Sequence, residues 1–173
     1  MGREVRMVPP NWEHPRTNRY GEEGYQPMYD KPYKQAAKEW MDECLLWHKG
    51  EHPSQMSEWA ADCEYYWEYD GNPPDKEYYL PELTEEPTWY QVYETVSEGT
   101  PVSPPFATKE ELVDYLVENG DFWDQRRGHS GPTREAAEAF VGMGWAPSFV
   151  GTVGGGIVSG VDACAELKQE EEP

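Results

Sequence analysis

Branched aliphatic side chains are scarce in this sequence. It holds one Ile, seven Leu and twelve Val, and together with four Phe these make up only 24 of 173 residues. With a formal net charge of -20, such a composition is typical of chains that stay unfolded, because they bury too little apolar surface to offset lost conformational entropy. The eight Trp and twelve Tyr argue the other way, since each ring can bury roughly 150–250 Å². We therefore expect a folded domain with a core of aromatic rings.

Long apolar runs and cysteines are also few. No stretch approaches the roughly 20 apolar residues that span a bilayer, and the first residues lack the apolar region of a secretory signal. The three cysteines, Cys44, Cys63 and Cys164, are odd in number and widely spaced. That pattern favours reduced thiols over a disulfide framework. We expect a cytoplasmic protein.

Positive charge is rare and unevenly placed. The chain has 14 Lys and Arg against 34 Asp and Glu, and residues 51–98 hold thirteen acidic residues with one cation, Lys76. This stretch would repel nucleic acid and anionic membranes, because binding to phosphates needs clustered Lys and Arg. It would attract a protein with a basic surface, or a cation. The alternative is that the acidity only keeps a ring-rich chain soluble.

We predict an α+β fold in a single domain over residues 32–166. Residues 1–31 are predicted to be an irregular arm, because their prolines and glycines disfavour long regular elements. The arm holds Trp12 and several Tyr, so we expect it to pack along the domain. Residues 167–173 are predicted to be a frayed acidic tail.

Two helices are predicted in the first half of the domain. Apolar residues recur at three- and four-residue spacing over 32–49, with Asp30 as N-cap and Gly50 as the residue that ends the helix. A shorter helix is predicted over 54–63. The ring-rich segment 64–69 either extends it or forms a strand.

Two further helices have clear start signals. Thr108 and Glu111 fit a capping box, in which each side chain binds the backbone N–H of the other residue. The helix that follows is predicted to end at Asn119-Gly120. Another is predicted from Thr133 to Gly144.

Residues 89–96 alternate in the manner of a strand. The set of Tyr90, Val92, Glu94 and Val96 shares one face, which is expected to face the core except at Glu94. Residues 149–162 predict two short strands joined by the glycines at 154–156. Paired with 89–96, they would complete a small antiparallel sheet packed by three to four helices.

Metal, cofactor and catalytic signals are weak. Cys44, His48 and His52 have the spacing of zinc ligands on one helix face, but Gly50 should end that helix first, so we expect no metal. The glycines at 154–156 match neither a phosphate-binding loop nor a dinucleotide fingerprint, so we expect no cofactor. His129, in a loop with two arginines, is a candidate general base for a small hydrolase; the alternative is a solvated loop.

The Ser-, Thr- and Pro-rich loop over 97–105 is a candidate binding site. A stiff loop loses little entropy when it binds a ligand, and loops held by rigid elements often carry function. The alternative is that its prolines only turn the chain from strand to helix. A pocket for a small anionic, nucleotide-like ligand is predicted to comprise Trp89, Tyr93, Ser97, Thr100, Ser103, Trp123, Arg126 and Arg127.

Several segments resemble a family of small proteins encoded by bacteriophages. They are Y-W-E-Y-D-G-N-P-P-D (66–75), E-E-P-T-W-Y-Q-V-Y-E-T-V-S-E-G-T-P-V-S-P-P-F-A-T (85–108), E-E-L-V-D-Y-L-V-E-N-G-D-F-W (110–123) and G-W-A-P-S (144–148). The resemblance covers roughly residues 60–150. It implies a phage gene expressed in a bacterial cytoplasm, and it carries no functional residue with it. By analogy, small phage proteins often bind a host factor, including a component of a defence system.

These observations favour a non-enzymatic phage accessory protein that binds a basic host protein through its acidic surface. Glu82, Glu85 and Glu86 are the predicted protein-binding residues. The first alternative is a protein that sequesters a small ligand with the 88–106 loop. The second is the small hydrolase that uses His129 with a nearby carboxylate.

Overall fold

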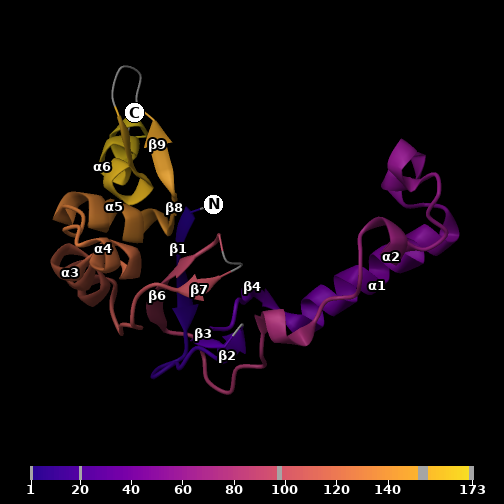
Figure 1. Ribbon diagram of the computed structural model, residues 1–173, viewed down its shortest axis with the longest axis horizontal. Coiled ribbons are helices and arrows are strands. Elements are labelled where there is room, and N and C mark those ends of the chain that lie inside the picture. Colours follow the sequence, from indigo (N-terminus) through magenta and orange to yellow (C-terminus); the bar gives the residue numbers. More distant parts are fainter. Residues whose placement is uncertain (1, 20, 97–98, 152–155, 172–173) are drawn as a thin grey trace. The chain divides into compact units, whose positions relative to one another are not determined.

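The computed structural model describes residues 2–19, 21–96, 99–151 and 156–171 of an α+β protein (Figure 1). The chain forms two compact units. Unit 1 comprises Met1–Pro27 and Leu83–Pro173, and unit 2 comprises Met28–Glu82. The sequence predicts a single domain over residues 32–166, whereas the compact units of the structure divide the chain after residues 27 and 82.

Unit 1 contains a four-stranded antiparallel sheet with the strand order β7-β6-β1-β8. Its centre is the pairing of β1 (Gly2–Val8) with β6 (Trp89–Glu94), in register from Arg3 opposite Glu94 to Val8 opposite Trp89. β7 (Thr100–Pro101) and β8 (Trp145–Pro147) flank this pair.

The prediction of an irregular arm is wrong for most of residues 2–25. Residues 2–8 contain no proline and form a central strand, while β2 (Arg16–Arg19) and β3 (Glu22–Tyr25) form an antiparallel hairpin. The prolines are confined to the connections between these strands. Tyr20 lies outside the described residues.

The described residues of unit 1 form four helices: α3 (Lys109–Asn119), α4 (Phe122–Arg127), α5 (Arg134–Met143) and α6 (Gly160–Glu171). The capping box of α3 is confirmed, because the Thr108 hydroxyl accepts from the Glu111 N–H at 3.1 Å and the Glu111 carboxylate accepts from the Thr108 N–H at 3.1 Å. The helix predicted from Thr133 is confirmed as α5.

The predicted tail is wrong up to Glu171, since residues 160–171 hold helix-favouring Ala, Glu, Leu, Lys and Gln; residues 172–173 lie outside the described residues.

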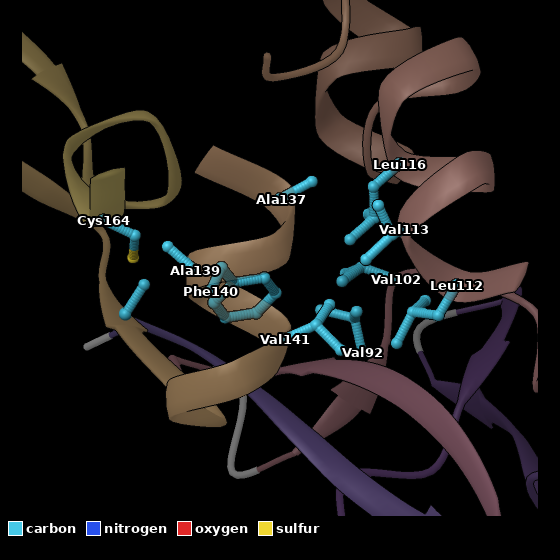
Figure 2. Close-up of a cluster of buried hydrophobic side chains, with 11 residues drawn as sticks. Val92, Val102, Leu112, Val113, Leu116, Ala137, Ala139, Phe140, Val141 and Cys164 are labelled. Carbon is cyan, nitrogen blue, oxygen red and sulfur yellow. The ribbon is translucent and has the colours of Figure 1, made fainter. Parts of the chain in front are cut away.

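The core of unit 1 is aliphatic, and this differs from the ring-based core that we predicted. Its buried side chains converge from β6 and from helices α3, α5 and α6 (Figure 2). Among the residues that the structure describes, Phe140 is the only ring in the buried cluster of Val92, Val102, Leu112, Val113, Leu116, Ala137, Ala139, Phe140, Val141, Ala146 and Cys164. The few branched side chains of the sequence are concentrated here, and Ala fills the space between closely packed elements.

The strands at the C-terminal end of unit 1 form a sheet of their own. β9 (Phe149–Gly151) and β10 (Ile157–Ser159) pair with each other, which confirms two short strands in this segment. Their predicted pairing with residues 89–96 is wrong, because both edges of β6 are already occupied by β1 and β7. Gly154 and Gly155 lie outside the described residues.

Unit 2 is built on α1 (Tyr33–Lys49), which confirms the first predicted helix, with Gly50 in the left-handed conformation at its end. The predicted N-cap Asp30 is wrong: it lies in β4 (Tyr29–Pro32), which pairs in parallel with β5 (Tyr79–Leu80), and Pro32 takes the N-cap position. The predicted second helix is two short 3-10 turns, η1 (Pro53–Met56) and η2 (Glu58–Ala60). A one-turn helix α2 (Tyr66–Tyr69) and a 3-10 turn η3 (Lys76–Tyr78) follow.

Aromatic rings supply the core of unit 2, as the composition predicted for the whole chain. Trp47 stacks on Tyr69 with a centroid distance of 5.1 Å and lies 5.8 Å from the ring of Tyr66. Trp40 packs against the same cluster.

The three cysteines carry free thiols. Within the described ranges, none of the helices is both long enough and apolar enough to cross a membrane.

Phe140→Ala should lower the free energy of unfolding by about 3–5 kcal/mol, because it leaves a cavity at the centre of the aliphatic cluster. Met143→Ala, in the same helix but exposed, should change it by no more than about 0.5 kcal/mol. Denaturant unfolding of the two variants measures both values. Equal effects would show that the cluster is not the core of unit 1.

Candidate functional site

Residues 51–70 of unit 2 expose large apolar side chains among carboxylates. Met56 is 94% exposed and Trp59 is 88% exposed, and the rings of Tyr65 and Trp67 are exposed as well. The stretch contains no Lys or Arg and six acidic residues: Glu51, Glu58, Asp62, Glu64, Glu68 and Asp70. We call residues 51–70 the acidic–aromatic surface.

Local structure holds two of these rings in place. Tyr65 and Trp67 stack in parallel, with centroids 4.4 Å apart and an angle of 4° between their planes. The carboxylate of Glu68 accepts hydrogen bonds from the backbone N–H groups of Glu64 at 2.7 Å and Tyr65 at 2.9 Å. These bonds fix the start of α2, so the stacked pair loses little further freedom when it is bound.

Tyr66, between the two exposed rings, anchors this turn to the core of unit 2. Its side chain is buried against Trp47 and Trp40. Burial, assisted by a hydrogen bond to Asp70, raises the pKa of Tyr66 to about 12. The phenol is therefore neutral at physiological pH and suited to its buried position.

The carboxylates of the acidic–aromatic surface have no cationic partner in the described part of the chain. Two lysines of β4 and α1 pair elsewhere: Lys31 with Glu39 at 2.7 Å and Lys38 with Asp42 at 2.6 Å. Lys34 pairs with Glu82. The negative charge of residues 51–70 thus remains available to a partner.

The three predicted protein-binding residues do not lie in one unit. Glu82 belongs to unit 2, whereas Glu85 and Glu86 belong to unit 1. The hydrogen bond from Lys34 lowers the pKa of Glu82, and the ion pair neutralises its charge. Glu85 and Glu86 are exposed.

In unit 1, part of the predicted binding loop lines a cavity of about 710 Å³. Pro101, Ser103 and Pro104 form one wall, and Trp12 and Tyr25 from the N-terminal segment form another. We had not foreseen that residues 12–25 take part. Their rings in the arm were the only signal in the sequence, because nothing local shows that the arm covers β6.

A chain of hydrogen bonds joins His14, Gln91 and Ser103, which line this cavity. The buried imidazole of His14 lies 3.1 Å from the Tyr93 hydroxyl through Nδ1 and 2.7 Å from the Gln26 carbonyl oxygen through Nε2. Tyr93 donates to Gln91 Oε1 at 3.0 Å, and Gln91 donates to the Ser103 carbonyl at 2.8 Å. These bonds join the N-terminal segment, the central strand and the loop.

A second cavity of unit 1, about 680 Å³ in volume, holds Trp123 and Arg127. Carboxylates of Glu94, Asp121 and Asp124 lie in its wall, together with Asp162 at the start of α6. Arg126 is exposed, with its guanidinium 6.0 Å from the centre of the Trp123 ring. It does not line the cavity.

The predicted ligand-binding residues are therefore divided between two cavities. Ser103 lines the first and Tyr93 lies beneath it, whereas Trp123 and Arg127 line the second. The cause is the alternation of β6, which directs Gln91 and Tyr93 to one face and Val92 and Glu94 to the other. Trp89 and Thr100 lie in β6 and β7 and line neither cavity; Ser97 lies outside the described residues.

The strand faces differ in part from the prediction. Val92 is buried and Tyr90 packs on the core, as expected, but Val96 is exposed because β6 ends at Glu94. Gln91 and Tyr93 on the opposite face are buried too. Both faces of this strand are covered.

His129 is exposed, and its backbone N–H donates to the Asp124 carbonyl at 2.9 Å. In the described ranges its imidazole has no hydrogen bond to a carboxylate that would orient it as a general base. His52, one of the residues considered as zinc ligands, instead accepts from the Ser54 N–H at 3.1 Å and pairs with Glu43 at 2.9 Å. Among the described residues no group of three or more His, Cys, Asp or Glu is placed to hold a metal.

Comparison with protein-family models, with curated proteins and with solved structures finds no match to this chain.

His14 should make the stability of the protein depend on pH. Burial is the main cause that lowers its pKa below 6.5, and the nearby Arg6 guanidinium acts in the same direction. The folded state therefore favours the neutral imidazole, and this contribution is full above pH 6.5 and is lost as the pH falls below the folded pKa. The difference in unfolding free energy between the wild type and His14→Gln should shrink between pH 8 and pH 5.

His129→Gln provides the control, because its imidazole is exposed. Urea unfolding at several pH values measures all three proteins. A gap between wild type and His14→Gln that stays constant over this range would contradict the prediction.

Proposed function

We propose that this protein is a non-enzymatic binding protein that captures a basic partner protein through its acidic–aromatic surface. The observation that carries the proposal is the exposure of Trp59 and Met56, at 88% and 94%, within a stretch free of Lys and Arg. Exposed apolar surface is a mark of interaction sites, and Trp is the residue most enriched among those that dominate binding energy.

The surrounding charge selects the partner's chemistry. Six carboxylates attract a basic surface and speed its approach. An Arg or Lys placed over a Trp or Tyr ring gains about 0.5–2 kcal/mol. Unit 1 makes the same contact internally, where the Arg6 guanidinium lies 4.5 Å from the centre of the Tyr93 ring. A partner rich in surface arginine therefore fits both features of the acidic–aromatic surface.

The resemblance to phage-encoded proteins supports a host protein of the bacterial cytoplasm as the partner. Basic surfaces on such proteins commonly serve to bind nucleic acid. Occupying one would displace the nucleic acid, and the host protein, including a defence factor, would then be inhibited.

The exposed indoles should dominate capture. The double variant Trp59→Ala/Trp67→Ala, immobilised and mixed with bacterial lysate, should retain about tenfold less of the partner protein, as expected when residues of this kind are removed. Trp145→Ala is the control, because Trp145 is 52% exposed but lies in β8 of unit 1. Quantitative mass spectrometry of the bound fraction gives the result. Equal capture by the double variant and the wild type would refute the role of this surface.

Charge neutralisation separates the two acidic regions. Glu51→Gln/Glu58→Gln/Asp62→Asn should weaken capture and flatten its dependence on salt between low and physiological ionic strength, because exposed charges are screened. Glu85→Gln/Glu86→Gln should leave both unchanged. If instead only Glu85→Gln/Glu86→Gln weakened capture, the binding surface would include Glu85 and Glu86, as the sequence analysis predicted.

A further inference from the structure

We infer that the cavity lined by Trp123 in unit 1 is a binding site for a small organic cation, an amine or guanidine carried on an apolar body. The argument uses unit 1 alone and does not depend on the proposed function, which concerns residues 51–70. The cavity volume of about 680 Å³ lies in the range of about 300–1,000 Å³ typical of small-molecule sites.

The cavity offers an apolar lining for the body of such a ligand. Part of this lining comes from the core, through Val92, Leu116 and Phe140. Another part comes from the β9–β10 strands, where Phe149, Ile157 and Val158 are exposed and reach the same cavity. An apolar ring or chain inside the cavity would cover these side chains and gain the free energy of burying apolar surface.

Three of the charged groups in the wall satisfy one another. Arg3 Nε donates to Asp121 Oδ2 at 2.5 Å, and its Nη1 lies 3.8 Å from Glu94 Oε1. Glu94 also accepts from the indole Nε1 of Trp123 at 2.6 Å. This set fixes the Trp123 ring in the wall, and its two carboxylates outnumber its single guanidinium.

The remaining charges determine the sign of the ligand. Asp124, Asp162 and Arg127 also line the cavity, and among the described residues no ion pair is found for any of the three. Burial raises the pKa of both carboxyls, and the charge of Asp121 adds to the effect at Asp124. The wall therefore holds four carboxylates against two guanidinium groups and the imidazole of His129. Carboxylates are in excess, so a bound cation would lower the repulsion among them, whereas an anion would be repelled by more groups than attract it.

An organic cation fits better than a metal ion. In the part of the chain that the structure describes, no three carboxylates or imidazoles converge on one point. The apolar side chains of the lining offer no ligand atoms to a metal ion, whereas they can pack against the apolar body of an organic cation. The Trp123 ring is also a group that attracts cations, and outside the cavity the Arg126 guanidinium lies 6.0 Å from its centre.

Three probes with the same ring and different charge test the site: benzylamine, benzyl alcohol and benzoate. Benzylamine should bind with a dissociation constant of about 1 mM, the weak affinity expected of a ligand with roughly eight heavy atoms, and should quench the fluorescence of Trp123. Benzyl alcohol should bind more weakly and benzoate not at all. Tighter binding of benzoate, or equal affinity for all three probes, would overturn the inference, as would the absence of benzylamine binding by calorimetry.

Charge variants locate the binding. Asp162→Asn should weaken benzylamine about fivefold, the effect of one partly exposed ion pair, and leave benzyl alcohol unchanged. Arg127→Gln should tighten benzylamine, because it removes a repelling cation. Glu110→Gln, on the exposed part of α3, is the matched control and should change nothing.

One more variant separates this site from the proposed function. Trp59→Ala/Trp67→Ala should bind benzylamine like the wild type. If that variant lost benzylamine binding while Asp162→Asn bound benzylamine as tightly as the wild type, the cation would bind to unit 2, and the inference for the cavity would be overturned.

Discussion

The pairing of β1 with β6 is the interaction on which the rest of unit 1 depends. It pairs Arg3 with Glu94, which are separated by about half the length of the chain. Through this register, Arg3 reaches the carboxylates of the Trp123 cavity, and the chain that leaves β1 carries His14 across the opposite face of β6 to Tyr93. The N-terminal segment thus contributes to the wall of the Trp123 cavity and of the cavity beside Ser103, and neither contribution would exist without the pairing.

The shortage of aliphatic side chains is met differently in the two units. Unit 1 gathers Val, Leu and Ala around Phe140, whereas unit 2 packs Trp47 with Tyr66 and Tyr69. A ring buries much area per residue and carries a polar group at its edge. Rings therefore suit a small unit with little interior. Trp59 and Trp67 are not needed in this core and remain exposed at the surface. The same composition that argued for a ring-based core also provides the surface that we propose for binding.

Local signals predicted the helices well. The capping box at Thr108, the glycine after α1 and the start at Thr133 each depend on groups within four residues of one another, and the structure contains all three. The sequence did not predict that β1 lies at the centre of a sheet, because β-pairing between residues so far apart leaves no local trace. The sequence analysis assigned Trp123 and Arg127 to one site for an anion. The carboxylates in the same cavity come from β6, α4 and α6, and their proximity could not be predicted because it depends on the tertiary fold.

The order of the strands also sets an order of assembly. β1 is synthesised before both of its neighbours, and β8 begins only at Trp145. The central strand must therefore wait for nearly the whole of unit 1 before its backbone groups are paired on both edges, a long-range closure of the kind that slows folding. Unit 2, continuous from Met28 to Glu82, has no such delay. Nascent chains interrupted before residue 145 would contain a complete unit 2 and, in unit 1, a strand with one edge open to other chains.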